Sequence, residues 1–425
     1  MKHLRIVLYS HDSLGLGHVR RNLALASALS RQLPGLTGRQ VTGVLVAGTA
    51  LAPGFQIPKG WDWVILPGVT KGAAGYEPRD LSVPLQDLVS LRGKLLDSLL
   101  QGFSPDLVIV DRHATGIQLE LEGALRRLRA RGSARVVLGL REVLDSPEAA
   151  IAEWDGIGGP RRVQELFDAV WIYGDRSVHD PVAAGEIPFS LRRMVSYTGY
   201  LAAGRPKGSG KLKMTGRYVM TTVGGGADGY ALARLAAATP LPAGLGHLIV
   251  AGPQMPKAQR RDLRRQAGPG VVIVKALEDM LAHISNADAL VSMGGYNSVC
   301  EILSTAVPAL IVPRDHSRSE QKIRAASLAA AGYLEQQELA TLTPGILAGW
   351  IADRAGTRVD RRGAQLNGLS RVPGLAADLL KARELEAQDA IRPLSQQITG
   401  EPVISAQISS MAQSLRGGAA HAAAV

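Results

Sequence analysis

Short apolar runs alternate with longer amphipathic stretches along almost the whole chain. A continuous apolar run is typical of a parallel strand that is covered on both faces, and the stretches between these runs have the length of helices. The expected strands are LRIVLY, VTGVLVA, WDWVILP, DLVIVD, ARVVLGL, DAVWIYG and MVSYTG in the first half of the chain and RYVMTTVG, GHLIVAG, VVIVKA, DALVS and PALIVP in the second. The pattern predicts an α/β protein built from doubly wound parallel sheets.

The alternation is interrupted near the middle of the chain by the stretch GYLAAGRPKGSGKLKMTG. A segment rich in Gly, Pro, Ser and Lys without an apolar period is typical of a linker between domains. We therefore expect an amino-terminal domain over 1–200, a linker over 201–216 and a carboxy-terminal domain over 217–375. A closing helix is expected over 376–392, and the Ser-, Ala- and Gly-rich residues 393–425 are expected to be mobile.

The composition supports two cores and a reducing compartment. The chain has 425 residues, of which 46% are apolar, and a single core stops growing at roughly 250–300 residues. Cys300 is the one cysteine, which excludes a disulfide or a cysteine-based zinc site within one chain. No start typical of a leader peptide and no apolar run near the ~20 residues that span a bilayer is evident. The expected location is the cytoplasm, with peripheral attachment to the inner face of the plasma membrane as a further option.

The formal net charge is +11, and part of it is concentrated in three groups of basic residues. These are Arg126, Arg127, Arg129, Arg131 and Arg135; Lys207, Lys211, Lys213 and Arg217; and Arg260, Arg261, Arg264 and Arg265. Such groups attract anionic lipid, phosphorylated small molecules or nucleic acid. Only 4% of the residues are aromatic, and no basic run carries interleaved aromatics for base stacking, so nucleic acid is disfavoured. The alternative is that these arginines only solvate helix surfaces.

The first expected strand is followed by SHDSLGLGHVRRN, with Gly15, Gly17 and His18 where a helix should begin. A glycine turn between a strand and a helix is a common binding place for an anion or nucleotide, because free backbone N–H groups and the helix dipole point outward there. The spacing is not GxGxxG, so a dinucleotide is not indicated, and His18 needs a separate explanation.

Polar residues follow several strands of the second half in the same way. A strand that ends near Ser292 is followed by the turn Met293–Ser298 and a helix that carries Glu301. Another strand ends at Pro313 and is followed by a polar loop and Glu320-Gln321. Ligands of doubly wound sheets bind beyond the carboxyl ends of the strands, so these groups should face one cleft.

The segment from 274 to 332 resembles the carboxy-terminal donor half of the MurG-like, family 28 glycosyltransferases. The resemblance rests on Asp279-Met280, Gly294-Gly295, Glu301, Pro313 and Gln321, in that order. It implies the GT-B fold, in which two Rossmann-like domains face one another. Glu301 would then bind the ribose hydroxyls of a nucleotide, Glu320 and Gln321 the hexose, and the backbone around Leu277–Met280 the base. The full set of expected donor-binding residues is Gly224, Gly225, Gly226, Leu277, Met280, Gly294, Gly295, Asn297, Ser298, Glu301, Glu320 and Gln321.

By the same resemblance, GLGHVRR is the amino-terminal glycine loop of the acceptor domain. A histidine, with an ordinary pKa of about 6.5, is mostly neutral and yet basic near pH 7, so His18 is the candidate base that deprotonates the acceptor. The alternative is that His18 caps the helix or binds a phosphate. Asp111 ends a strand and is the candidate partner that orients His18, although it could simply cap the next helix. Gly15, Gly17 and Arg141 are expected on the acceptor or phosphate side, and for Arg141 a structural salt bridge is an equal alternative.

The sequence thus predicts an inverting transferase that moves a hexose from a nucleotide-diphosphate sugar, with uridine as the expected nucleotide, to a hydroxyl acceptor. The acceptor can be lipid-linked, which would bring the protein to an anionic membrane surface. No metal site or other cofactor is expected, because the carboxylates that lie near a histidine in the sequence do not have the spacing of metal ligands. The alternatives are a sugar-nucleotide epimerase or hydrolase of the same fold, and a non-catalytic nucleotide-sugar binding protein.

Overall fold

The computed structural model describes residues 3–11, 16–72, 75–205, 210–314 and 318–398. The chain divides into two compact units, Met1–Ala377 and Asp378–Val425. The first unit contains both sheets and every residue discussed below as part of a site.

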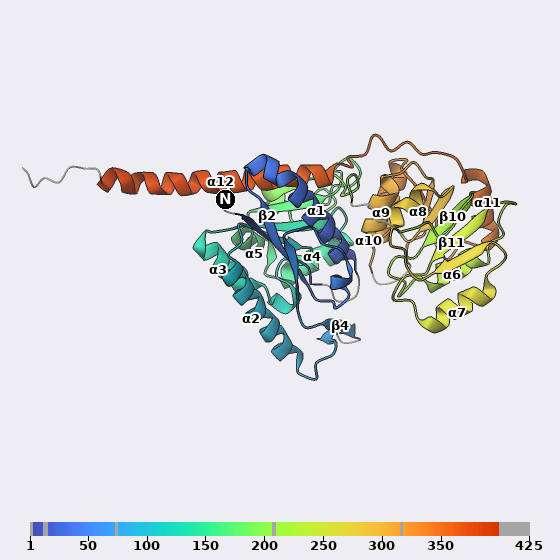
Figure 1. Ribbon diagram of the computed structural model, residues 1–425, viewed down its shortest axis with the longest axis horizontal. Helices are drawn as coiled ribbons and strands as arrows, with labels where there is room; N and C mark the ends of the chain where they lie inside the picture. Colours follow the sequence, from blue (N-terminus) through green and yellow to red (C-terminus); the bar gives the residue numbers. More distant parts are fainter. Residues whose placement is uncertain (1–2, 12–15, 73–74, 206–209, 315–317, 399–425) are drawn as a thin grey trace, which may run out of the picture. The chain divides into compact units, whose positions relative to one another are not determined.

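The first sheet lies in the blue-to-green part of Figure 1. It has seven strands in the order β3-β2-β1-β6-β7-β8-β9, and its neighbouring strands are parallel. Their bounds are β1 Leu4–Tyr9, β2 Val41–Ala47, β3 Trp61–Ile65, β6 Leu107–Asp111, β7 Arg135–Arg141, β8 Ala169–Tyr173 and β9 Val195–Tyr197. The α-helices of this part are α1 Gly17–Thr37, α2 Leu85–Phe103, α3 Glu122–Arg131, α4 Pro147–Gly156 and α5 Gly159–Leu166. A small antiparallel hairpin, β4 Val69–Gly72 with β5 Gly75–Pro78, was not expected from the sequence.

The second sheet has six strands in the order β12-β11-β10-β13-β14-β15, again parallel. Their bounds are β10 Tyr218–Thr222, β11 Gly246–Val250, β12 Val271–Val274, β13 Ala289–Ser292, β14 Ala309–Ile311 and β15 Glu335–Gln336. The helices are α6 Tyr230–Ala237, α7 Lys257–Gln266, α8 Met280–Ser285, α9 Tyr296–Leu303, α10 Glu320–Ala330, α11 Pro344–Arg354 and α12 Gly368–Ile398. The predicted α/β class with two parallel sheets is confirmed.

Apolar strands buried on both faces explain this architecture. Five of the six residues of β1 are buried, the exception being Arg5, and all five residues of β6 are buried. Glycine is required where a neighbour crosses a strand closely: a Cβ on Gly139, in the middle of β7, would overlap the hydroxyl of Tyr173 on β8. This packing fixes the carboxyl ends of β6, β7 and β8, from which the candidate site is built.

The predicted domain boundaries stay predictions, but the elements around them are clear. The first sheet ends with β9, and the second begins with β10. Part of the predicted linker, 206–209, lies outside the described residues, as does 399–425 of the predicted mobile tail. The expected closing helix over 376–392 lies within α12, which runs on to Ile398. Among the described residues, no helix is both long and apolar enough to cross a bilayer.

Candidate functional site

The amino-terminal residues of the candidate site lie at the carboxyl end of the first sheet. Gly17 is the first residue of α1, one position before His18, while Gly15 lies outside the described residues. Asp111 is the last residue of β6, and Arg141 is the last residue of β7. The parallel register therefore presents these side chains at one edge of the sheet.

His18 and Asp111 are in direct contact, with 2.6 Å between His18 Nδ1 and Asp111 Oδ2. Asp111 is completely buried, and burial alone would raise its pKa. The charge of Arg21, together with the hydrogen bonds that His18 and Arg21 donate, outweighs burial and holds the pKa of Asp111 well below its usual range. An ionised carboxylate can only accept hydrogen bonds, so Nδ1 of His18 is the donor and the lone pair of the neutral ring lies on Nε2. The catalytic roles of both residues remain predictions.

Arg21 is the third member of this group, and the sequence did not single it out. Its Nε donates to Asp111 Oδ1 at 2.9 Å and its Nη2 donates to Asp111 Oδ2 at 2.6 Å. The same Nη2 is 3.1 Å from His18 Nδ1, and the guanidinium carbon lies 5.4 Å from the ring centre of Tyr296. The available signal was helical spacing, since Arg21 follows His18 by three positions and so shares its face of α1.

Two further histidines lie beside His18. The ring centre of His11 is 5.0 Å from that of His18 and 4.0 Å from that of His113. Burial holds the pKa of both His11 and His113 well below the usual range, with a smaller contribution from neighbouring positive charges. Arg112, between Asp111 and His113, has a left-handed backbone with φ of 69°. A non-glycine residue in that conformation is strained, and such strain is concentrated at functional sites.

The carboxylate of Glu301 on α9 is 3% exposed and contacts the first half of the chain. Arg20 Nη2 donates to Glu301 Oε1 at 2.5 Å. The other oxygen, Oε2, is buried and has no hydrogen-bond partner among the described residues. A buried acceptor without a donor is costly, so this oxygen is suited to receive a hydroxyl group of a ligand. Arg20 was not predicted from the sequence as part of the site.

Arg141 and Glu320, which the sequence assigned to the acceptor and donor sides respectively, form an ion pair. Burial lowers the pKa of Arg141 to about 10, although Glu320 opposes this effect. Burial would raise the pKa of Glu320, but Arg141 and other arginines lower it to about 2. Gln321 accepts a hydrogen bond from the backbone N–H of Arg314 at 3.2 Å. The salt-bridge alternative for Arg141 thus describes a contact that is present.

The first turn of α9 is tied to the first half of the chain as well. Asn297 Nδ2 donates to the carbonyl of Gly17 at 2.8 Å, and Asn297 Oδ1 accepts from Arg205 at 3.0 Å. Gly294 has a φ of 74°, and a Cβ there would lie 2.6 Å from Ile311. Gly295 caps α9, and a Cβ on it would meet nothing within 4 Å. Ser298 is the third residue of α9 and is half-buried.

A third ion pair across the same contact is buried on both sides. Arg324 on α10 donates to Glu142 through Nε at 2.7 Å and through Nη2 at 3.2 Å, and each side chain is 1% exposed. Arg324 Nη1 also donates to the carbonyl of Gly294 at 3.3 Å. Tyr296 donates to the carbonyl of Tyr173 at 2.8 Å. These contacts hold the glycine turn of the second half against the strand ends of the first.

The remaining predicted donor-side residues lie on two other strand ends of the second sheet. Gly224 and Gly226 follow β10 with φ of 61° and 89°, and Gly225 lies between them. The helix after them, α6, begins at Tyr230, with Gly229 at its N-cap position. Leu277 and Met280 follow β12, and Met280 is the first residue of α8. These loops share the carboxyl edge of the sheet with Gly294 and Glu301.

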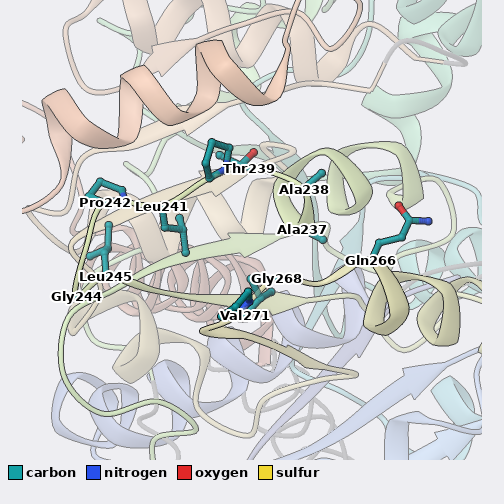
Figure 2. Close-up of a pocket in the computed structure, with 12 residues that line it drawn as sticks. Ala237, Ala238, Thr239, Leu241, Pro242, Gly244, Leu245, Gln266, Gly268 and Val271 are labelled. Carbon is teal, nitrogen blue, oxygen red and sulfur yellow. The ribbon is translucent and has the colours of Figure 1, made fainter.

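A separate pocket lies at the opposite edge of the second sheet (Figure 2). Its volume is about 460 Å³, and its walls come from the segment between α6 and β11 and the segment between α7 and β12, including Leu241, Leu245 and Gln266. It therefore adjoins the amino-terminal ends of the strands, away from the predicted site. Among the described residues, no group of three or more His, Cys, Asp or Glu side chains could hold a metal ion.

Residues 226–355 match the glycosyltransferase family 28 C-terminal domain. The UDP-N-acetylglucosamine--N-acetylmuramyl-(pentapeptide) pyrophosphoryl-undecaprenol N-acetylglucosamine transferase of Corynebacterium efficiens is 35% identical over 113 residues, which cover 26% of this chain and 31% of that protein. An uncharacterized glycosyltransferase of Methanosarcina acetivorans is 24% identical over 268 residues, which cover 60% of this chain and 65% of that protein. The chain thus spans less than two thirds of the length of either relative.

Solved structures define the class of fold. CalG4, the calicheamicin glycosyltransferase, superposes with a TM-score of 0.56 at 17% identity, covering 90% of this chain and 98% of that chain. The protein therefore has the GT-B fold that the sequence predicts. The match of residues 226–355 to the family 28 C-terminal domain confirms the resemblance that the sequence indicates over residues 274–332.

Proposed function

We propose that this protein is an inverting glycosyltransferase that moves a hexose from a nucleotide-diphosphate sugar, a UDP-sugar in the first instance, to a hydroxyl group of an acceptor. The family 28 domain and the named relatives support the glycosyltransferase class. The observation that carries the proposal is the chain of contacts on one turn of α1. His18 there contacts Asp111, and Arg20, two residues later, contacts Glu301.

In this proposal Glu301 binds the nucleotide. Oε2 of Glu301, which has no partner among the described residues, accepts a hydrogen bond from one ribose hydroxyl. Oε1 accepts a hydrogen bond from the second ribose hydroxyl, either in place of the Arg20 hydrogen bond or in addition to it. Charge-assisted hydrogen bonds of this kind contribute roughly 1.5–3 kcal/mol each. The glycine turns after β10 and β13 offer backbone N–H groups to the diphosphate, since α6 and α9 begin there. Glu320 and Gln321, at the start of α10, are assigned to the hexose.

The chemical step is a displacement at the anomeric carbon. Nε2 of His18 takes the proton of the acceptor hydroxyl while the acceptor oxygen forms a bond to the anomeric carbon. The bond between the anomeric carbon and the diphosphate oxygen breaks, and its electron pair goes to the diphosphate oxygen. The nucleoside diphosphate leaves from the opposite face, so the configuration inverts. Asp111 stabilises the imidazolium of His18 through the hydrogen bond to Nδ1. Arg20 and Arg141 contact Glu301 and Glu320, the residues proposed to bind the donor, so their positive charges lie close enough to help neutralise the leaving diphosphate.

The acceptor is proposed to be a hydroxyl compound, a lipid-linked one included, reached from the cytoplasmic face of a membrane. The Corynebacterium efficiens relative is named for transfer to a pyrophosphoryl-undecaprenol compound, which supports this choice. The basic residues of α3 supply a surface that is attracted to anionic lipid.

A two-stage assay tests the proposal. A thermal-shift screen of nucleotide sugars first identifies the donor, because a ligand that binds only the folded state raises the melting temperature. The donor is then incubated with and without lipid and soluble acceptor extracts, and products are separated by mass and anomeric configuration. Transfer with inversion that requires an acceptor is expected. An epimer or free sugar formed from donor alone would identify an epimerase or hydrolase instead, and tight binding without turnover would identify a binding protein.

A further inference from the structure

Arg21 lies in the core of the candidate site, although nothing in the sequence motif assigns it a task. Its side chain is 2% exposed, and it grips both oxygens of Asp111. Burial alone would lower the pKa of Arg21, but the charge of Asp111 raises it above its ordinary value, so the guanidinium is permanently charged. The group therefore contains one fixed cation and one fixed anion before His18 takes up any proton.

The geometry makes Arg21 more than a support for Asp111. Its Nη2 is 3.1 Å from His18 Nδ1, and both atoms carry hydrogens because Nδ1 donates to Asp111. A second positive charge on the His18 ring would thus develop directly beside the guanidinium. Asp111 faces both cations, so its charge is already compensated by Arg21 when His18 becomes protonated.

We propose that Arg21 is the positioning residue that keeps His18 in its neutral, proton-accepting form and so sets the lower end of the pH range of the reaction. The inference rests on the proposed function of His18 as the base. Without Arg21, the pair of His18 and ionised Asp111 would favour the imidazolium, which cannot accept a proton. With Arg21 present, the three side chains have no net charge at rest.

The other groups around His18 do not replace this effect. The pKa of His11 and that of His113 are held low by burial, so both rings are neutral. Arg112 donates a hydrogen bond to Glu153 at 2.5 Å, so its positive charge is partly compensated by that carboxylate. The phenol pKa values of Tyr173 and Tyr296 are raised by burial, so both are uncharged. Asp12 lies outside the described residues.

The test compares the pH dependence of kcat/KM for Arg21→Met, Arg21→Lys and Asp111→Asn. Removing the positive charge in Arg21→Met should move the acid limb of the profile upward by about one pH unit or more, which is typical of a charge within a few ångströms. Asp111→Asn should move it downward, since Arg21 then acts uncompensated. Arg21→Lys keeps the charge and should leave the limb close to that of the parent. If Arg21 and Asp111 had only a structural role, their variants would not shift the acid limb of the pH profile in opposite directions.

Arg92→Met is the matched control. Arg92 is also fully buried, and it grips the carboxylate of Glu120 through Nε at 2.5 Å and Nη2 at 2.8 Å. Its loss should lower the melting temperature as much as Arg21→Met does, with no movement of the acid limb. Equal limbs for Arg21→Met and the parent, together with a lowered melting temperature, would overturn the proposal and leave Arg21 as a structural cation.

Arg21→Met alone leaves a buried carboxylate without its partner and can fail to fold. The double variant Arg21→Met, Asp111→Asn removes both charges and avoids that cost. Its His18 ring is followed by NMR titration, with the resonance assigned by its loss in His18→Gln. The midpoint should lie above that of Asp111→Asn, and equal midpoints would refute the proposal. This NMR titration needs no turnover, so it tests the role of Arg21 even if no transferase activity is found. A failure of the proposed function can thus be distinguished from a failure of the proposed role of Arg21.

Discussion

Arg20 on α1 donates a hydrogen bond to Glu301 on α9, although the two residues are 281 positions apart in the chain. The contact joins the helix that carries His18 to the helix that follows the glycine turn of the second sheet. Among the described residues, one buried oxygen of Glu301 has no donor, and Arg20 is about one third exposed. If the proposed function holds, this contact relates donor binding to the position of α1.

Glu301→Ala should weaken nucleotide affinity at least tenfold, because the charge-assisted hydrogen bonds to a ribose are worth roughly 1.5–3 kcal/mol. Isothermal titration calorimetry with the nucleoside diphosphate measures this directly. Glu338→Ala, an exposed glutamate of the same half, is the matched control and should bind like the parent. Parental affinity in Glu301→Ala would remove this residue from the donor site.

Arg141→Met should lower the free energy of unfolding by up to about 3–5 kcal/mol, since the buried carboxylate of Glu320 loses its nearer arginine and keeps the more distant Arg314, at 3.5 Å. The double variant Arg141→Met, Glu320→Gln removes both charges and should recover most of that loss. Urea denaturation of the two variants measures the difference. A single variant as stable as the parent would indicate that the ion pair opens in solution, which favours the phosphate-binding alternative for Arg141.

His18→Ala should reduce turnover by about 10²–10⁴-fold with donor affinity nearly unchanged, because a general base need not touch the nucleotide. Asp111→Asn should act through the same proton transfer, so the double variant should lose less than the product of the two single losses. Kinetics and melting curves of the three variants provide the test. A helix-capping role for His18 predicts instead a stability loss of ~0.5–2 kcal/mol without selective damage to turnover.

His247 should make the folded state sensitive to acid. It is buried on β11, where its Nε2 is 2.7 Å from Thr221 Oγ1, and burial lowers its pKa to about 4. The unfolded chain binds a proton near pH 6.5 while the folded chain does not, so stability falls as the pH drops from about 6.5 to about 4, by up to ~3 kcal/mol. His247→Gln keeps a polar group near Thr221 and should flatten the melting temperature over this pH range. An unchanged slope in His247→Gln would assign the effect elsewhere.

The basic residues of α3 should give salt-sensitive binding to anionic vesicles that is weaker than their number suggests. Arg126 pairs with Glu122, and Arg127 pairs with Asp97. Arg129 and Arg135 both contact Asp168. Co-sedimentation should rise with the fraction of anionic lipid and fall with salt, since charge attraction is screened within about 8–10 Å at physiological ionic strength. No binding at low salt would favour a soluble acceptor.

The strands and the edge at which the site lies could be predicted because both depend on local patterns. Continuous apolar runs specify strands that are buried on both faces, and the parallel connections bring their carboxyl ends to one edge. Asp111, Arg141 and Gly294 end or follow strands, so their place at this edge of the sheets could be predicted from position alone, while their roles stay predictions.

Arg20, Arg21 and Arg324 could not be predicted as members of the candidate site, because their contacts depend on partners far along the chain. Arg21 and Asp111 are 90 positions apart, and Arg324 and Glu142 are 182 apart. In the sequence these side chains are indistinguishable from the many arginines of a basic protein, and a buried guanidinium is expected only once its carboxylate is known. The helical spacing of Arg21 from His18 was the one local signal, and it specifies a shared face rather than a contact.

Cys300 lies on α9 beneath the glycine turn, fully buried, and burial raises the pKa of its thiol. A protonated, inaccessible thiol reacts slowly with maleimides and oxidants. A cysteine introduced on the exposed surface would therefore be the only readily labelled position of the native chain. One dye on each half, added through two such cysteines, would report by energy transfer how the halves move as a nucleotide sugar binds, with no native thiol to be removed first.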